Sequence, residues 1–482
     1  MTAPLTLHPD RLFPADPTVR SIARELYAAV RDLPIVSPHG HVPVEWLADD
    51  EPFPDPTTLL LTPDHYTNRI LHAVAGVELA DLGVPVGSSM TPERSREAFR
   101  ILCRNWPVFR GTQVQYWLEW QLVELFGIDE RPSAGNADRL YDRIAACLAS
   151  DEYRPRALFE RFGIELLATT DDPCDPLDGH RRLAEDSTWA GRVVPTFRPD
   201  RYLEPAHPDF PTRMAELGRA ADREIRSYAD HVEAMRIRRR YFRDHGAVSS
   251  DHSHRDARCA RLEDAEAERL FGRALAGDLT AQEGDALRAH MVHEQANLAR
   301  EDGLVMTLHP AAYRNHDSQA FARYGADVGG DVPMAAEFVE ALRPVLDAHG
   351  NAPGFHLVVF TMDETVYSRE LAPLAGWYRG LYVGAPWWFI DENDAMLRYR
   401  RATTGYGTLM KGSGFIDDTR AYCSIPARHD AARRVDCAFL AGLVAEHRLA
   451  LDEAAETAVD LVVAQPRRAF KLDPATGKDD PA

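Results

Sequence analysis

The distribution of apolar and polar positions along the chain predicts an alternation of helices and short strands. The first predicted helix is capped by Asp16, carries Pro17 in its first turn and keeps a helical apolar spacing up to Val30. Beyond it, short apolar runs that stop in polar or charged residues recur, which is typical of buried strands. We predict eight strands, at residues 34–37, 164–170, 193–197, 247–250, 304–308, 356–361, 381–384 and 414–416.

The segment between the first two predicted strands has a helical pattern instead. Amphipathic stretches such as Tyr116 to Leu125 indicate a large, mainly helical insertion after the first strand. The predicted organisation therefore has four parts. They are the N-terminal helix and first strand (1–43), the helical insertion (44–163), the remaining α/β unit (164–470) and a flexible polar tail (471–482).

Eight strands with helical connections are the number that a (β/α)8 TIM barrel requires, so the predicted fold class is α/β with a distorted barrel. In a barrel, polar residues at the carboxyl ends of the strands build the active site. A doubly wound open sheet would give the same alternation, and the pattern favours the barrel without excluding the open sheet. The last predicted helices, 431–449 and 451–464, would complete the outer layer.

Charge and composition narrow the classes of function. The 482 residues include 55 Lys plus Arg and 75 Asp plus Glu, a formal net charge of −20. This balance argues against nucleic-acid binding and against an anionic membrane surface, because both need a basic face. No apolar run approaches a membrane span, the first 14 residues lack a signal-peptide core, and the six cysteines lack metal-site spacing. We therefore expect a cytoplasmic protein with reduced thiols.

Lysine is almost absent, which limits the available chemistry. Only Lys411, Lys471 and Lys478 occur, and the last two lie at the polar C-terminus. Schiff-base chemistry or a carbamylated-lysine metal bridge would have to use Lys411. A phosphate-binding loop also needs a lysine, but the residues around Lys411 do not match the motif of such a loop. We assign no role to Lys411.

Two short motifs at strand ends are candidates for chemistry. His39 and His41 are two residues apart, so on an extended strand both imidazoles point to the same side and can meet one metal ion. A capped loop or a satisfied polar pair would explain them equally well. Asp418 offers a carboxylate as metal ligand or general base, with Arg420 on the same side. The alternative there is a solvated turn with a surface ion pair.

Three further residues have weaker signals. His309 ends a predicted strand, although a single histidine is more often structural than functional. Tyr66 lies in the helical insertion, where a buried tyrosine with one hydrogen bond is the default expectation. Trp388 fits core packing as well as it fits a wall on which a sugar could stack.

In their order and spacing, these motifs resemble those of the uronate isomerases (glucuronate isomerases), a family of the amidohydrolase superfamily with a distorted (β/α)8 barrel. The likeness covers nearly the whole chain. It rests on His39-Gly40-His41, Asp64-His65-Tyr66, Thr169 to Pro173, Pro195 to Pro199, Ser250-Asp251-His252, Leu308-His309, Pro386 to Phe389, Asp418-Thr419-Arg420 and Ser424 to Asp430.

The resemblance implies a reaction and a set of roles. The family interconverts D-glucuronate with D-fructuronate, and D-galacturonate with D-tagaturonate. His39, His41 and Asp418 would hold one divalent metal, expected to be zinc, that binds the C6 carboxylate and the C5 hydroxyl of the hexuronate. Asp418 would move a proton from C2 to C1, while Tyr66 and Arg420 would shuttle a proton between the C1 and C2 oxygens of a cis-enediol. These are the groups an aldose–ketose shift needs.

The same resemblance suggests a substrate pocket formed by His65, Arg198, Asp251, His309 and Trp388. Arg314 joins this set because an acidic protein must bind an anionic substrate through local positive charge. Hydrolytic sites of the superfamily often add a carbamylated lysine on the fourth strand and a histidine on the sixth. Here the fourth predicted strand ends without a lysine and the sixth without a histidine, which favours one metal over two. We also expect a homo-oligomer.

The sequence departs from the family pattern at a few positions around these motifs, and two alternative functions stay open. The departures are Pro38, Gly40, Pro310, Ala311 and the extra acid Asp417. The first alternative is a hydrolase of the same superfamily, in which the metal activates water for Asp418 to deprotonate. The second is a non-catalytic protein that binds sugar acids.

Overall fold

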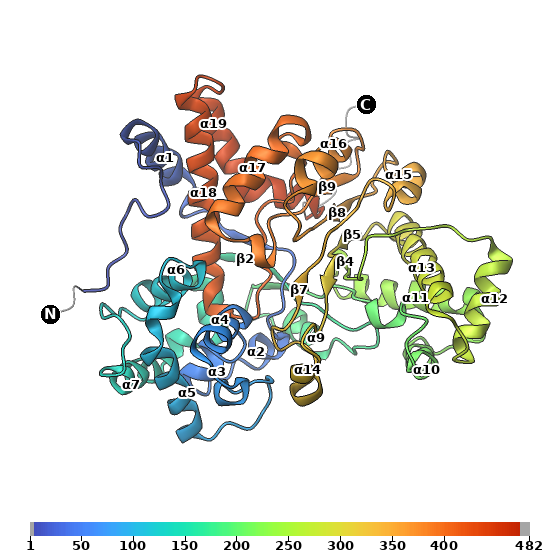
Figure 1. The fold of residues 1–482 in the computed structure, drawn as a ribbon, viewed down its shortest axis with the longest axis horizontal. Coiled ribbons are helices and arrows are strands. Elements are labelled where there is room, and N and C mark those ends of the chain that lie inside the picture. Colours follow the sequence, from blue (N-terminus) through green and yellow to red (C-terminus); the bar gives the residue numbers. More distant parts are fainter. Residues whose placement is uncertain (1–3, 473–482) are drawn as a thin grey trace.

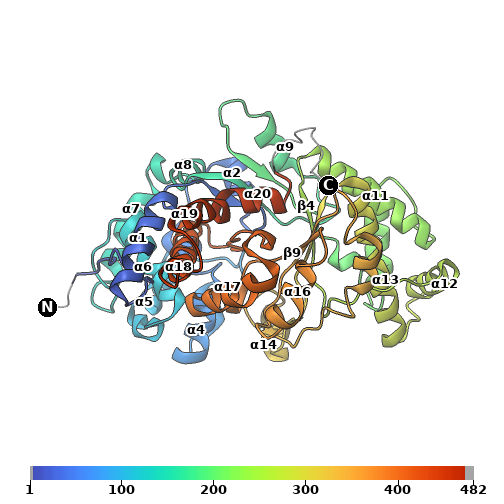
Figure 2. The same cartoon turned by 90° about the horizontal axis from the view of Figure 1, so that it is seen from above.

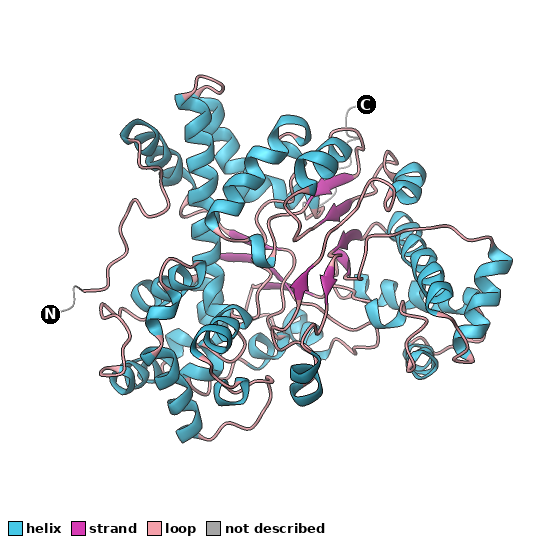
Figure 3. Ribbon diagram, viewed as in Figure 1, coloured by secondary structure: helices cyan, strands magenta, loops and turns pink. Residues whose placement is uncertain are grey.

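Short parallel strands lie at the centre of the molecule and helices surround them (Figures 1 and 3). This is a computed structural model, and it describes residues 4–472. Seven parallel strands coincide with predicted ones. They are β1 (Ile35–Ser37), β2 (Ile164–Ala168), β3 (Arg192–Val194), β4 (Ser249–His252), β5 (Val305–Leu308), β8 (Leu357–Val359) and β9 (Leu381–Val383).

The strands follow one another in sequence order, as they do in a barrel. One sheet has the order β1-β2-β3 and the other β4-β5-β8-β9, and every pairing within them is parallel. Phe197 joins the two sheets, because it forms isolated bridges with Asp171 on one side and Ser250 on the other. At the open edge, the backbone N–H of His41 donates to the carbonyl of Thr419 at 3.1 Å. The fold class is therefore α/β with the strand order of a distorted (β/α)8 barrel.

The predicted eighth strand at 414–416 is wrong in detail. Only Gly412 pairs with β9, through a parallel bridge to Val383, and the chain beyond it is irregular. Gly414 has φ +74° and packs tightly against Pro466, so the backbone leaves the extended conformation there. The segment still reaches the place where an eighth strand would end, and this place contains Asp418.

Helices fill the chain between β1 and β2, as the pattern predicts. They share a core rich in aromatic side chains, including Trp106 and Trp117, and gather on one side of the strands (Figure 1). Their bounds are α2 (Val44–Asp49), α3 (Pro56–Leu60), α4 (His65–Ala75), α5 (Pro92–Arg104), α6 (Gln113–Trp120), α7 (Ala137–Leu148) and α8 (Pro155–Arg161).

The remaining helices cover the outside of the strands (Figure 2). Helix α1 (Pro17–Val30) begins where predicted, with the Asp16 carboxylate accepting from the backbone of Thr18 and Val19. The others are α9 (Asp178–Glu185), α10 (Phe210–Ala220), α11 (Tyr228–Asp244), α12 (Asp264–Leu275), α13 (Ala281–Asp302), α14 (Ser318–Tyr324), α15 (Arg343–His349), α16 (Ala372–Ala375), α17 (Asn393–Gly407), α18 (Ile425–Ala445), α19 (Leu451–Val459) and α20 (Gln465–Ala469).

A small antiparallel hairpin follows β5 and has no counterpart in the predicted elements. Strand β6 (Ala312–Tyr313) pairs with β7 (Val332–Pro333), with α14 between them.

Lys411 makes contacts with the backbone: its ammonium donates to the carbonyls of Tyr378 and Arg379, at 3.1 and 2.8 Å. Of the predicted tail, residues 473–482 lie outside the described part of the chain. Among the described helices, none is long and apolar enough to span a membrane.

Candidate active site

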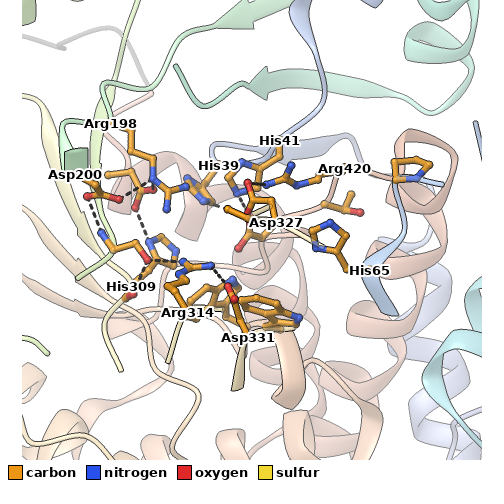
Figure 4. Close-up of a pocket in the computed structure, with 18 of the residues that line it drawn as sticks. His39, His41, His65, Arg198, Asp200, His309, Arg314, Asp327, Asp331 and Arg420 are labelled. Atoms are coloured by element: carbon orange, nitrogen blue, oxygen red, sulfur yellow. Dashed lines mark hydrogen bonds and ion pairs between the residues drawn. The ribbon is translucent and has the colours of Figure 1, made fainter. Parts of the chain in front are cut away.

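A cavity of about 530 Å³ opens at the carboxyl ends of the strands (Figure 4). All eleven residues named from the sequence line it. They are His39, His41, His65, Tyr66, Arg198, Asp251, His309, Arg314, Trp388, Asp418 and Arg420. They come from the ends of six strands, from the irregular segment that contains Asp418, and from the start of α4. Residues up to 381 positions apart in the sequence thus meet in one pocket.

His39 and His41 meet Asp418 at the junction between the first and last segments of the barrel. The Nε2 atoms of His39 and His41 lie 3.3 and 3.1 Å from the same oxygen, Oδ1 of Asp418. The histidine loop is fixed on both sides, because the hydroxyl of Thr170 donates to the carbonyl of Gly40 at 2.8 Å and His41 bonds Thr419. The position of the two rings therefore follows from how β2 and the Asp418 segment enclose the end of β1.

The spacing of these atoms fits a metal ion. A tetrahedral site with ligands about 2.0–2.1 Å from the ion puts neighbouring ligand atoms about 3.3 Å apart. His39, His309 and Asp418 also each offer one atom within 4.8 Å of the other two. Asp418 Oδ1 is buried and has no hydrogen-bond partner among the described residues. A buried carboxylate oxygen facing imidazole nitrogens is what a divalent cation would satisfy.

His309 has the second contact that metal-binding histidines commonly make. Its Nδ1 lies 2.6 Å from Oδ1 of Asp251, which also accepts from the hydroxyl of Thr307 at 2.9 Å. This bond leaves Nε2, buried and unpaired among the described residues, as the free nitrogen of the ring. The ring itself is stacked between Phe360, at 4.1 Å, and His39, at 4.7 Å. The structure thus adds His309 to the residues that could hold a metal.

Several residues in or beside this pocket have a strained backbone. Ala311 follows β5, Trp388 follows β9 and Asp418 lies in the irregular segment after Gly412, and all have positive φ, of +67°, +51° and +39°. Residues with a Cβ rarely adopt this conformation, and where they do the strain is often linked to function. At Asp418 the unusual backbone accompanies the placement of the carboxylate opposite the two histidines.

The electrostatics keep Asp418 ionised. Burial alone raises the pKa of Asp418, but His39 and His41 outweigh it and hold this pKa well below its ordinary value. Burial lowers the pKa of His41 to about 4, so this imidazole is neutral at pH 7. The charged carboxylate and the neutral His41 are in the ionisation state that metal binding requires. Burial lowers the pKa of His39, but the charges of Asp418 and Asp251 outweigh it and raise this pKa, so a metal would displace a proton from His39.

Six arginines line the cavity, and the three that the sequence analysis named each pair with an acid (Figure 4). Arg198 Nε lies 2.8 Å from Asp200 and 3.5 Å from Asp251. The other pairs are Arg314 with Asp331, at 2.7 Å, and Arg420 with Asp327, at 2.9 Å. These pairs hold the guanidinium groups in place, and an anionic ligand would compete with the carboxylates for them.

Tyr66 occupies a different environment from the other pocket residues. Its hydroxyl donates to Oδ2 of Asp391 at 2.7 Å, and Arg428 Nη1 donates to the same oxygen at 3.0 Å. Asp391 and Arg428 are both buried. Burial is the main reason why the pKa of Tyr66 lies well above its ordinary value.

Sequence reasoning missed most of the partners of the named residues. Asp327 and Asp331 lie in the hairpin segment, where no apolar pattern marks a strand end. Asp200, two residues beyond Arg198, could have been found from that spacing. Arg428 is in the Ser424 to Asp430 motif, but the motif gave no indication of where its side chain points. Asp391 carries no sequence signal, because its partners are 325 and 37 residues away.

The fold and the site together define a class. This is a (β/α)8-barrel protein whose strand ends carry a histidine–carboxylate group able to hold a metal ion, beside paired arginines suited to an anion.

Comparisons with known proteins identify the family within this class. The family model described as glucuronate isomerase matches residues 18–470. A uronate isomerase from Cutibacterium acnes is 54% identical over 471 residues, 98% of this chain and 100% of that protein. The crystal structure of glucuronate isomerase from Caulobacter crescentus is 46% identical, with a TM-score of 0.95 over 99% of this chain and 100% of that one. A uronate isomerase structure from Thermotoga maritima is 25% identical, with a TM-score of 0.89 over 96% and 99%. The chain belongs to the glucuronate isomerase family.

Proposed function

We propose that this protein is a metal-dependent uronate isomerase that interconverts D-glucuronate with D-fructuronate and D-galacturonate with D-tagaturonate. The observation that carries the proposal is the convergence of Asp418 with His39 and His41 in the cavity that also contains Tyr66 and Arg420. These groups supply a base, proton donors and positive charge beside one another, as an aldose–ketose shift through an enediol requires.

His39, His41 and Asp418 are proposed to hold one divalent metal, with His309 as a further candidate ligand. The mixture of imidazole and carboxylate donors suits zinc. When bound, the metal would supply positive charge that anchors oxygen atoms of the hexuronate and stabilises charge that develops on them. The spacing of the donor atoms and the unpaired Nε2 of His309 support this assignment.

Asp418 is proposed as the base that removes the C2 hydrogen as a proton and returns it at C1. Its low pKa and its position in the cavity support this role, because the base must be ionised when the aldose binds. Tyr66 and Arg420 are proposed to move the second proton between the C1 and C2 oxygens. Both side chains line the cavity, and Arg420 is held in place by Asp327.

The remaining pocket residues are proposed to bind and orient the hexuronate. Arg198 and Arg314 would provide local positive charge for its carboxylate, in a chain whose net charge is −20. His65 and Trp388 would contact the sugar ring, while Asp251 positions His309. Cytoplasmic location and homo-oligomeric assembly remain predictions from the sequence.

Isomerisation and metal dependence can be tested together. The purified protein is expected to contain about one divalent ion per chain and to convert D-glucuronate, D-galacturonate or both to the ketose, followed by NMR. Treatment with a chelator should abolish conversion, and added zinc should restore it, because the histidine–carboxylate group is the only candidate metal cluster found among residues 4–472. Binding of glucuronate without any ketose would indicate a sugar-acid binding protein instead.

A further inference from the structure

Behind Tyr66 lies a buried acid that the proposed roles leave unexplained. Asp391 follows the short turn that contains Trp388, and α17 begins just beyond it. Its carboxyl accepts hydrogen bonds from both Tyr66 and Arg428 at one oxygen, Oδ2. Tyr66 and Arg428 line the cavity, and Asp391 is 6% exposed. Two contacts therefore link Asp391 to the cavity, and of these only the hydroxyl of Tyr66 can exchange a proton near neutral pH, because a guanidinium stays protonated.

Arg428 fixes this arrangement in two ways. Its guanidinium lies over the rings of Tyr66 and Trp117, at 4.7 and 3.7 Å from their centroids. Its Nε donates to the hydroxyl of Ser424 at 3.0 Å, which holds the side chain on its own helix, α18. Tyr66 is thus held between a cation on its ring and a carboxyl on its hydroxyl. An arginine that served only to neutralise Asp391 would not need to cover the tyrosine as well.

We infer that Asp391 stores the proton that Tyr66 moves between the two substrate oxygens. This inference rests on the proposed function. With the aldose bound, the hydroxyl of Tyr66 would donate to the C1 oxygen and accept from Oδ2 of protonated Asp391, which reverses the Tyr66–Asp391 bond seen in the structure. As Asp418 removes the C2 hydrogen, Asp391 gives its proton to the Tyr66 oxygen, and Tyr66 gives its own proton to the C1 oxygen. The product of this step is a neutral enediol. The C2 hydroxyl then gives its proton to Tyr66, and Tyr66 returns one to Asp391, as Asp418 delivers its proton to C1.

The charges balance at each stage of this sequence. At the start Asp418 is ionised and Asp391 is neutral, in the enediol state the two are reversed, and at the end the starting state is restored. No oxidant or reductant is needed. Arg428, at 3.0 Å from Asp391, stabilises the carboxylate while it is ionised. Asp391 is a positioning residue in this scheme, because it acts on the substrate only through Tyr66.

The acidity of Asp391 is consistent with this role. Burial raises the pKa of Asp391 to about 7, with Arg428 opposing the rise and the charge of Asp418 adding to it. A carboxyl with this pKa can carry a proton when the aldose binds and can release it near neutral pH.

The test replaces Asp391 with asparagine and follows D-glucuronate in deuterated water by NMR. Asparagine keeps the shape and the acceptor oxygen but cannot release a stored proton. We expect kcat for ketose formation to fall about 100-fold, with KM within about twofold of the wild-type value. Asp418 can still remove the C2 hydrogen, so deuterium should enter C2 of the recovered glucuronate faster than ketose forms. In the wild type, ketose formation should be the faster process.

A double variant tests whether Asp391 acts through Tyr66. In a Tyr66→Phe background, Asp391→Asn should cause no further loss, because the path it serves is already interrupted. Additive losses would overturn the inference. So would a single Asp391→Asn variant with the wild-type ratio of deuterium entry to ketose formation. If asparagine prevents folding, Asp391→Glu is tested instead. Because glutamate can still store a proton, it should keep the wild-type ratio of deuterium entry to ketose formation, and a higher ratio would overturn the inference.

Asp430→Asn is the matched control. Like Asp391, Asp430 is a poorly exposed carboxyl that accepts from tyrosine and arginine side chains. It lies on α18, its partners are Tyr116 at 2.6 Å, Arg11 at 2.7 Å, Tyr27 and Arg434, and it is outside the active-site cavity. This variant should keep the wild-type kcat and ratio, and a shifted ratio would contradict the inference. The proposed function is judged separately on the wild type: absence of ketose there refutes isomerisation, whereas an unchanged ratio in Asp391→Asn refutes only the role of Asp391.

Discussion

Asp418→Asn is expected to lower kcat for ketose formation at least about a thousandfold, since it removes the proposed base. The oxygen that both histidines approach, at 3.1 and 3.3 Å, would also become part of a neutral amide. We therefore expect weaker metal binding as well. Initial rates with saturating D-glucuronate and the metal content after dialysis measure the two effects separately.

The neighbouring residue provides the control for this variant. Asp417 is also buried, but its carboxylate accepts from Nε2 of His429 at 3.1 Å and does not line the cavity. Asp417→Asn should therefore keep its bound metal. Its kcat should fall less than about tenfold, because the substitution disturbs only the backbone and side chains next to the base. If Asp418→Asn kept a rate within tenfold of the wild type, Asp418 could not be the base.

Tyr66→Phe is expected to lower kcat for ketose formation about 100-fold or more, because it removes the hydroxyl that is proposed to move a proton between the two substrate oxygens. The ring and its contact with Arg428 would remain, so metal content and KM should change little. A hydrolase that uses metal-activated water would have no need of this hydroxyl. The variant therefore separates isomerisation from metal-dependent hydrolysis, the two chemistries that the sequence left open.

Tyr116→Phe is the corresponding control. Tyr116 lies on α6, donates to Asp430 at 2.6 Å and is outside the cavity. Losing its hydroxyl removes a buried hydrogen bond of similar length and should leave kcat unchanged. Wild-type isomerisation by Tyr66→Phe would exclude Tyr66 from the proton transfer and leave Arg420 as the remaining candidate.

The parts of the site that the sequence could predict depend on local signals. His39 and His41 are found from their spacing at the end of a strand, and Asp418 and Arg420 from their place after the last apolar run. These rules work because the parallel strands of a barrel all point their carboxyl ends to one face. Tyr66 and His65 have no such signal, since they begin a helix within the insertion. Only the family resemblance indicated them.

The parts that could not be predicted depend on contacts between distant segments. Asp391 meets Tyr66 across 325 residues, and Asp327 meets Arg420 across 93. No periodicity encodes such pairs. The predicted eighth strand failed for a local reason: an apolar triplet after Gly412 looks extended, but Gly414 turns the backbone before regular pairing forms. Asp418 still lies at the end of this segment, as predicted, although the strand itself does not form.

The scarcity of lysine has a structural consequence in the pocket. The anion-binding charge comes from arginines that are each held by an acid at 2.7 to 2.9 Å. Guanidinium groups can keep such a bond and still offer further N–H donors to a carboxylate, which an ammonium group does less well. A chain with a net charge of −20 can therefore still offer guanidinium donors to an anion within the pocket.

The most direct test of the central claim follows the hydrogen at C2. D-glucuronate labelled with deuterium at C2 is incubated with the enzyme in ordinary water, and the ketose and the remaining aldose are examined by NMR. Proton transfer by Asp418 through an enediol predicts that the ketose forms with part of the deuterium lost to water, since a carboxyl can exchange its proton. Ketose that retains all of the deuterium at C1, together with conversion by Asp418→Asn at the wild-type rate, would instead indicate a hydride shift and contradict the proposed role of Asp418.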